Sequence, residues 1–143
     1  MNISVRTELE IDATPERVWE VVTDLASYPD WNPVMRWMKG EARPDGTLRF
    51  RIEIGGLPPL VLSARVCACT PARELAWSGG PKAAFNGMHY LRLSPAGSGR
   101  TLLVHGEDFS GALVRGAFRR FVLPRIERSY EAMNRALATR ATS

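Results

Sequence analysis

The sequence predicts an α+β fold in which one antiparallel sheet of about seven strands packs against a long C-terminal helix. Apolar and polar residues alternate with the period of a strand over several segments between residues 3 and 109. Turns rich in glycine and proline separate these segments, and the chain changes to a helical period after Gly111. The 143 residues are enough for one hydrophobic core, so we expect a single domain spanning residues 1–143.

The first strand is predicted at Ile3–Ile11, where every second residue faces the core. A short helix should begin after Thr14, because Thr14, Pro15 and Glu16 supply an N-cap hydroxyl, a proline for the first turn and an acid near the positive helix end. The segment 28–33, with prolines at both ends of a Tyr-Pro-Asp-Trp-Asn-Pro run, ends this helix in a turn or a second short helix.

The middle of the chain repeats the strand period at 48–54 and 60–68. Turn residues follow the pattern of an antiparallel meander, at 44–46, 55–59, 71–72, 79–81 and 95–99. Cys67 and Cys69 lie two apart in a predicted strand, so we expect them on one side and reduced, since neighbours on one strand are poorly placed for a disulfide.

The C-terminal helix is predicted from an apolar stripe spaced by three or four residues, namely Val114, Phe118, Val122, Ile126, Tyr130, Met133 and Leu137. Pro124 removes one backbone hydrogen bond, which predicts a kink near residues 120–123. We expect the stripe to dock on the sheet and not on a membrane.

Composition and charge narrow the class of protein. Hydrophobic residues make up 45% and charged residues 24%, values typical of a globular domain. The net charge of +4 comes from scattered arginines without a compact basic run, so no nucleic-acid partner is predicted. The chain has no apolar run of membrane-spanning length and no apolar signal segment at its start, so we expect no stable membrane insertion and a cytoplasmic location.

A cavity is expected between the sheet and the long helix. If the sheet curls strongly, one long and two short helices cannot fill the space that it encloses. The four tryptophans at positions 19, 31, 37 and 77 would give such a cavity an apolar wall. The alternative is that these aromatic side chains simply fill a solid core.

The order of these elements and several strings resemble the SRPBCC superfamily over nearly the whole chain. The strings are Ile-Asp-Ala-Thr-Pro-Glu-Arg-Val-Trp at 11–19, Tyr-Pro-Asp-Trp-Asn-Pro at 28–33, Gly-Met-His-Tyr at 87–90 and His-Gly-Glu-Asp-Phe-Ser-Gly at 105–111. This superfamily of helix-grip proteins includes START lipid-transfer domains, pollen-allergen-like proteins and bacterial polyketide cyclases. The resemblance implies a curved seven-stranded sheet wrapped around the C-terminal helix, and it implies no single function.

Both histidines and a glutamate should share one apolar face of two neighbouring strands. If 95–99 is a hairpin loop, pairing Ser94 with Arg100 puts His89 opposite His105, and a shift of two residues puts His89 opposite Glu107. In either register these side chains lie on one face with Phe85, Gly87, Leu91, Leu93, Leu103 and Phe109. A bulge at Gly106 would invert the end of the second strand.

Three interpretations of His89 and Glu107 are open. In the first, the two residues form a satisfied structural pair, because a buried carboxylate without a partner is costly. In the second, they orient the polar end of a ligand. In the third, they catalyse an aldol cyclisation or dehydration of a polyketide, with His89 as general base and Glu107 orienting its ring. A two-histidine, one-carboxylate iron site is disfavoured, and neither a metal nor a cofactor is predicted.

We therefore expect a domain that binds a small hydrophobic molecule, lipid-like or polyketide-like, as a monomer or homodimer. The alternatives are a polyketide cyclase or dehydratase using His89 and Glu107, and a protein-interaction module like the co-chaperone branch of the superfamily, which would have a filled core and an exposed apolar patch. The candidate ligand-binding residues are Trp31, Trp37, Phe50, Trp77, Phe85, His89, Leu91, Leu103, His105, Glu107, Phe109, Phe118 and Val122.

Overall fold

The computed structural model describes residues 3–143 and confirms the predicted order of elements. The strands are β1 (Ile3–Ile11), β2 (Met35–Gly40), β3 (Thr47–Ile52), β4 (Leu60–Thr70), β5 (Glu74–Gly79), β6 (Asn86–Pro95) and β7 (Thr101–Ser110). They form one antiparallel sheet in the order β1-β7-β6-β5-β4-β3-β2. Between β1 and β2 lie α1 (Pro15–Thr23), η1 (Leu25–Ser27) and α2 (Tyr28–Trp31), and the chain ends with η2 (Phe118–Val122) and α3 (Leu123–Ala141).

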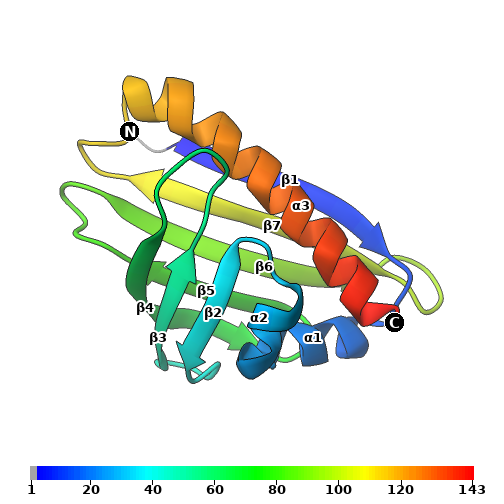
Figure 1. Cartoon of the computed structure of the whole chain (residues 1–143). Coiled ribbons are helices and arrows are strands. Elements are labelled where there is room, and N and C mark those ends of the chain that lie inside the picture. Colours follow the sequence, from blue (N-terminus) through cyan, green and yellow to red (C-terminus); the bar gives the residue numbers. More distant parts are fainter. Residues whose placement is uncertain (1–2) are drawn as a thin grey trace.

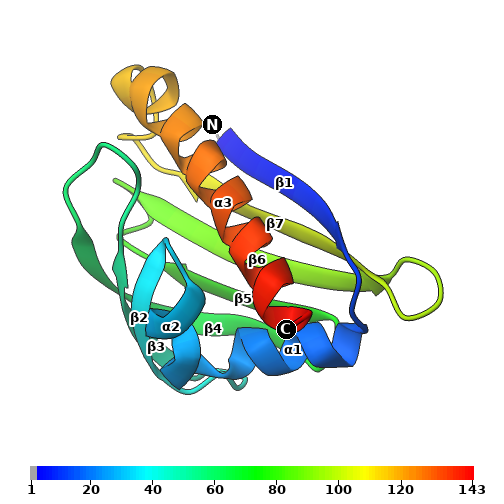
Figure 2. The ribbon, with the colours of Figure 1, turned by 45° about the vertical axis from the view of Figure 1, so that its right-hand side comes forward.

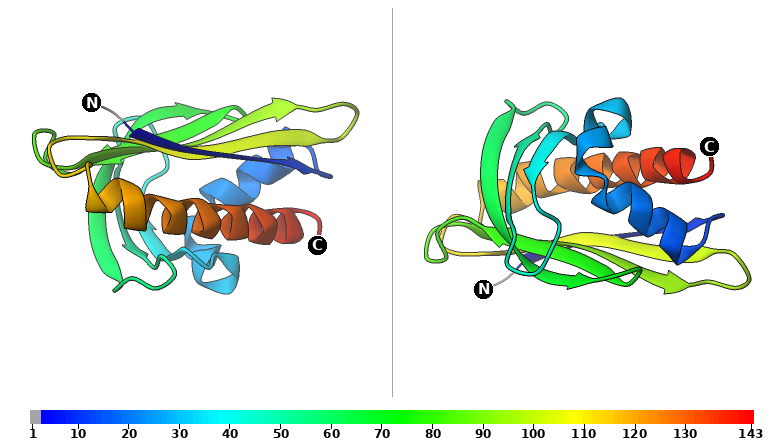
Figure 3. Two further views of the ribbon diagram at one scale, coloured as in Figure 1. Left: turned by 90° about the horizontal axis from the view of Figure 1, so that it is seen from above. Right: turned by 90° about the horizontal axis from the view of Figure 1, so that it is seen from below.

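Helix α3 lies across the concave face of the sheet (Figures 1 and 2). The sheet bends strongly, so that β1, β7 and β6 run along one side of the helix while β2, β3 and β4 rise beside it (Figure 3). The core lies between this concave face and the helices, and it includes Val5, Leu91 and Leu103 from the sheet and Met133 and Leu137 from α3. No helix within residues 3–143 is long and apolar enough to cross a membrane.

Helix α1 begins where the sequence predicts. The Thr14 hydroxyl accepts a hydrogen bond of 3.2 Å from the backbone N–H of Arg17, and Pro15 occupies the first turn, where its missing N–H costs nothing. Val18, Val21 and Val22 are buried on the inner face of the helix. The helix therefore packs through its valines and closes one end of the interior.

The C-terminal segment is less regular than one kinked helix. Bends and turns occupy residues 111–116, a π-helical turn follows at η2, and α3 then runs on in α-helical form. Pro124 follows η2 without a break in the helical run, so its missing N–H leaves a carbonyl of the preceding turn without a donor, and the irregularity falls in that turn, near the predicted residues 120–123. The apolar stripe of α3 is buried at Ile126, Tyr130, Met133 and Leu137.

The pairing of β6 with β7 decides between the two predicted registers. Pro95 pairs with Thr101, and His89 therefore lies opposite Glu107, while Leu91 lies opposite His105. The register shifted by two residues is the one observed. The pairs continue without interruption through Gly106 on both sides of β7, so the possible bulge there does not occur and both histidines and Glu107 share the concave face.

A bulge occurs instead in β4, between Val66 and Ala68. The extra residue is Cys67, which is exposed, whereas Cys69 packs partly buried against the core. The prediction that both cysteines point to one side was wrong, because the bulge shifts the alternation between them. At the other end of β4, Leu60 and Leu62 are exposed although they lie on the predicted apolar face.

Replacing Leu103 by alanine should lower the free energy of unfolding by about 2–5 kcal/mol, because the side chain is fully buried and its removal leaves a cavity. Urea denaturation measures this change. The same replacement at Leu113, which is 66% exposed, should change the free energy by no more than about 0.5 kcal/mol. Similar losses for the two variants would contradict this assignment of the core.

Candidate functional site

Polar side chains from β1, β6, β7 and α3 meet in the interior and form one hydrogen-bonded network. Thr7, His89, His105 and Asn134 are buried, as is Tyr130, which projects from α3 toward the sheet. Glu107 sits at the end of the network, and its side chain is 15% exposed. Because the three strands are neighbours in the sheet and α3 crosses them, the fold brings these residues together although they are far apart in sequence.

The contacts form a continuous chain. Asn134 Oδ1 lies 2.6 Å from His105 Nδ1, and the Nε2 atoms of His105 and His89 are 2.8 Å apart. His89 Nδ1 is 3.2 Å from the Tyr130 hydroxyl oxygen, and that hydroxyl donates a hydrogen bond to Glu107 Oε1. His89 Nδ1 and Glu107 Oε1 are 3.6 Å apart. Each side chain of this network thus has a hydrogen-bond partner, as burial away from water requires.

Aromatic packing holds the two imidazole rings in place. Trp77 of β5 stacks on His89 with ring centroids 4.5 Å apart and planes within 4° of parallel. Tyr130 stacks on His105 with a centroid separation of 4.4 Å. Neither imidazole can turn without losing this contact, so ring orientation is set by packing as well as by hydrogen bonds.

Burial determines the protonation of two members of the network. It lowers the pKa of His105 well below 6.5, and the neighbouring His89 lowers it further, against the opposing effect of the hydrogen bond to Asn134. Burial also raises the pKa of Tyr130 well above 10.0, with a further increase from the Glu107 charge. At neutral pH His105 is therefore an uncharged imidazole and Tyr130 keeps its hydroxyl hydrogen.

A cavity of about 90 Å³ adjoins the Glu107 end of the network. Its wall consists of Phe50, Leu62, Ser63, Ala64, Trp77, Gly79, Gly80, Phe85, Gly87 and Glu107. Glu107 is the only ionisable side chain that the described residues contribute to this wall. The space for its carboxylate depends on Gly87 of β6, where a Cβ atom would overlap with Glu107 Oε2.

Four of the sequence-predicted site residues line this cavity, namely Phe50, Trp77, Phe85 and Glu107. His89 and His105 lie behind them in the network. Phe109 and Phe118 form an aromatic cluster with Phe85, with centroids 5.1–5.7 Å apart.

The other predicted residues lie elsewhere. Leu91 and Leu103 are core residues, and Val122 packs against the core at the end of η2. Trp31 packs edge-on against Tyr28 and lines a hollow of the outer surface with Asp30 and Arg140. Trp37 lines another surface hollow, formed with η1 and α2. The structure does not bring these residues into the cavity wall.

Tyr130, Asn134 and Thr7 belong to the network and were not among the candidate site residues. A signal for them exists in the sequence. Thr7 is the polar member of an otherwise apolar strand face, and Asn134 follows Tyr130 by four residues, which places both on one side of a helix. A polar residue at a position that the pattern buries requires a hydrogen-bond partner. Thr7 and Asn134 bond each other, and the Tyr130 hydroxyl contacts His89 and Glu107.

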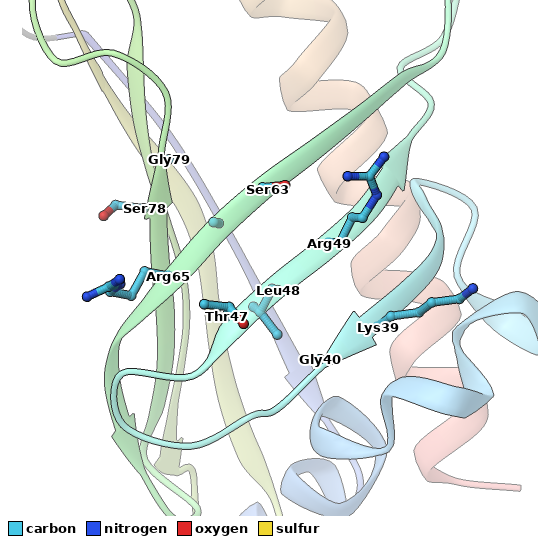
Figure 4. A pocket seen from close by; sticks show the side chains of 10 residues that line it. Lys39, Gly40, Thr47, Leu48, Arg49, Ser63, Arg65, Ser78 and Gly79 are labelled. Atoms are coloured by element: carbon cyan, nitrogen blue, oxygen red, sulfur yellow. The ribbon is translucent and has the colours of Figure 1, made fainter.

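A wider hollow of about 600 Å³ lies outside the sheet, over β2 to β5. Figure 4 shows the basic side chains of Lys39, Arg49 and Arg65 around it, and they point in different directions. Because these charges do not converge on one point, the hollow is a weaker candidate than the cavity beside Glu107.

The low pKa of His105 predicts a loss of stability in acid. The unfolded chain binds a proton on this histidine near pH 6.5 and the folded chain does not. The contribution is therefore complete above about pH 6.5 and is lost, at about 1.4 kcal/mol per pH unit, as the pH falls toward the lower folded pKa. In urea denaturation between about pH 5 and 8, His105→Gln should show a shallower decline in acid than the natural protein. Identical pH profiles would contradict the assignment.

The family model for "Polyketide cyclase / dehydrase and lipid transport" matches residues 2–142. No curated protein sequence matches the chain. Among solved structures, the Zhui aromatase/cyclase from Streptomyces sp. R1128 is similar, with a TM-score of 0.80 at 19% identity over 99% of this chain and 94% of that one. A START superfamily protein from Mycobacterium smegmatis has a TM-score of 0.78 at 23% identity, over 97% of each chain.

A point mutant of the norcoclaurine synthase of Thalictrum flavum has a TM-score of 0.71 at 15% identity over 99% of this chain and 95% of that one. Similarity at such low identity establishes a common fold. The family model matches nearly the full length of the sequence. The chain therefore belongs to the polyketide cyclase/dehydrase and lipid transport family.

Proposed function

We propose that the chain binds a small, largely apolar molecule between the sheet and the C-terminal helix, with the polar end of the molecule on Glu107. The observation that carries this proposal is the position of the Glu107 carboxylate. Oε1 is engaged by Tyr130, whereas Oε2 has no hydrogen-bond partner among residues 3–143 and belongs to a side chain that lines the cavity. A hydroxyl group on a ligand would donate to this free oxygen.

The volume of the cavity limits what can enter it. At about 90 Å³ it is smaller than the cavity of about 150 Å³ that holds benzene in an engineered protein. Only one end of a lipid or polyketide would fit, unless the aromatic wall moves. The binding end should therefore be compact and carry a single polar group.

The remainder of the ligand would leave the cavity beside β4. Leu62 lines the cavity and is 40% exposed, and Leu60, two residues away on the same face of the strand, is 57% exposed. A larger apolar molecule would cover these leucines and remove them from water. This burial would stabilise the complex by about 25 cal/mol for each Å² of apolar surface covered. Exposed apolar surface next to a cavity mouth is typical of a ligand-binding groove.

Binding of the fluorescent probe β-naphthol, followed by titration, tests this proposal. Ala64→Leu should weaken binding at least about tenfold, because three added carbon atoms fill most of a cavity of this size. Ala26→Leu, the same change on the exposed side of η1, should leave the affinity unchanged. Equal affinities for the two variants would place the probe elsewhere. No binding to the natural protein would favour the protein-interaction alternative, with native mass spectrometry of the protein from its own host as a check.

A second candidate function is catalysis by proton transfer, as in a cyclase or dehydratase. It is favoured by the contact of Glu107 with Tyr130 and, through it, with His89. The sequence-based hypothesis made His89 the general base. Because His89 is only 2% exposed and lies behind the cavity wall, the proposal gives the contact with substrate to Glu107.

The reaction that fits one carboxyl group is the dehydration of a β-hydroxy carbonyl compound. The Glu107 carboxylate would take the proton from the carbon beside the carbonyl, and the electron pair of that C–H bond would form an enolate. The C–O bond of the β-hydroxyl would then break as Glu107 returns its proton, which yields an enone and water. The site ends with the protons with which it began, so no further reagent is needed.

Glu107→Gln should reduce the dehydration of diacetone alcohol to mesityl oxide by about 10² to 10⁴ in rate, since the amide cannot take or return a proton. The absorbance of the conjugated product measures the rate. Asp108→Asn is the matched control, because Asp108 lies next in sequence but bonds Ser4 at 2.8 Å on the outer face. A full rate in the Glu107 variant would refute catalysis and leave the binding proposal standing.

A further inference from the structure

The donor and the acceptor of each hydrogen bond in the buried network can be assigned, starting from Thr7. The Thr7 hydroxyl oxygen lies 2.7 Å from the backbone carbonyl oxygen of His105. A carbonyl has no hydrogen to donate, so the hydrogen in this contact is the hydroxyl hydrogen of Thr7. Toward Asn134 the same oxygen can then only accept, and it accepts from Asn134 Nδ2 at 2.8 Å. The amide of Asn134 is thereby fixed with Oδ1 toward His105.

This orientation sets the tautomers of both histidines. Asn134 Oδ1 can only accept, so the hydrogen of the 2.6 Å contact is on His105 Nδ1. His105 is fully buried and uncharged, which leaves its Nε2 as an acceptor. The hydrogen between the two Nε2 atoms must therefore be on His89. His89 presents its remaining nitrogen, Nδ1, to Tyr130.

One hydroxyl hydrogen on Tyr130 then faces two acceptors, His89 Nδ1 and Glu107 Oε1. If Glu107 is a carboxylate, the hydroxyl donates to it, and His89 Nδ1 needs a hydrogen of its own to bond the Tyr130 oxygen. If Glu107 is a carboxylic acid, it donates to Tyr130 and Tyr130 donates to a neutral His89. In both arrangements the Glu107–Tyr130 and Tyr130–His89 contacts are hydrogen bonds. Both arrangements also hold one proton more than an ionised Glu107 together with a neutral His89.

We propose that Glu107, Tyr130 and His89 hold one shared proton, which moves between the carboxyl and imidazole groups through the Tyr130 hydroxyl, and that Thr7, Asn134 and His105 are positioning residues that impose this state. Without this proton, Glu107 is ionised, His89 is neutral and the Tyr130 hydroxyl donates to Glu107. The lone pair of His89 Nδ1 then faces the lone pairs of the Tyr130 oxygen without a hydrogen between them. Such an unsatisfied buried acceptor costs about 1–3 kcal/mol. The inference deepens the proposed function, on which its use rests, because the shared proton is then available to a ligand at Glu107.

If every hydrogen bond of the network had its donor and acceptor exchanged, no shared proton would be needed. If the Asn134 amide turned over, His105 would carry its hydrogen on Nε2 and His89 on Nδ1. His89 would then donate to Tyr130 and Tyr130 to an ionised Glu107, with no proton in excess. The Thr7 hydroxyl separates the two directions, because its contact with the His105 carbonyl allows it only to accept from Asn134.

Nuclear magnetic resonance of the histidine ring nitrogens in the whole, ligand-free protein tests this inference. The chain contains only two histidines, so His89→Gln suffices to assign both sets of signals. We expect His105 as the single Nδ1–H tautomer, and His89 with a hydrogen fixed on Nε2 and a second one shared at Nδ1. His105 as the Nε2–H tautomer, or His89 without a hydrogen on Nε2, would overturn the inference.

Thr7→Val and Thr7→Ser form the matched pair of variants. Valine has nearly the shape of threonine but cannot donate or accept, so both directions of the network should become populated and the His105 signals should report a mixture of tautomers. Serine retains the hydroxyl and should restore the single tautomer. A single unchanged tautomer in Thr7→Val would show that Thr7 does not set the direction. Should Thr7→Val fail to fold, the Thr7→Ser and natural spectra still decide between the two tautomers.

Because the spectra need no ligand, the two proposals can fail separately. The predicted tautomers without β-naphthol binding would refute the proposed function alone. Binding of β-naphthol with the opposite tautomers would refute the shared proton alone.

Discussion

The interior of this protein depends on one constraint: polar side chains that are removed from water must bond one another. Thr7, His105 and Asn134 are buried, and each unsatisfied donor or acceptor among them would cost about 1–3 kcal/mol. The network therefore fixes where α3 lies on the sheet, since Tyr130 and Asn134 reach their partners only when the helix crosses β1, β6 and β7 at this place. Apolar packing holds α3 on the sheet, and the polar contacts select its position.

The same constraint explains the small cavity. Tyr130 and the two imidazoles fill the centre of the space between sheet and helix, where a lipid carrier would keep a large hollow. The cavity of about 90 Å³ lies at the Glu107 end of the network, where Gly87 and Gly79 carry no side chains. The chain thus retains the architecture of its family, and the ligand that we propose would meet a compact site with an acidic end.

Much of the fold could be predicted because it follows from periodicity. Alternation predicted β1, β3, β4, β6 and β7, and the spacing of the buried residues Ile126, Tyr130, Met133 and Leu137 predicted the inner face of α3. The register of β6 and β7 remained open between two values, since it depends on how many residues of the hairpin loop pair. The bulge at Cys67 had no sequence signal and shifted the alternation of β4. Periodicity finds a face, but it does not find interruptions within a strand.

The sequence predicted which residues share the face that forms the site, but it did not predict the role of each residue. Strand parity alone put His89, His105 and Glu107 on one face. Which of them could contact the proposed ligand depends on how deeply each side chain is buried. Trp77, which stacks on His89, and Tyr130, which reaches His89 from the C-terminal helix, determine this. These tertiary contacts leave Glu107 at the cavity and enclose His89.

The cost of the network bears on its purpose. A buried polar cluster seldom stabilises a fold more than well-packed apolar side chains of the same volume. A wall of leucines and phenylalanines would hold an apolar ligand equally well and would spare the chain the need to satisfy each polar atom. The network departs from such a wall most at Glu107, whose second oxygen has no hydrogen-bond partner among residues 3–143. A carboxyl group joined to an imidazole through a hydroxyl is suited to exchanging a proton with the proposed ligand, which an inert carrier has no need to do.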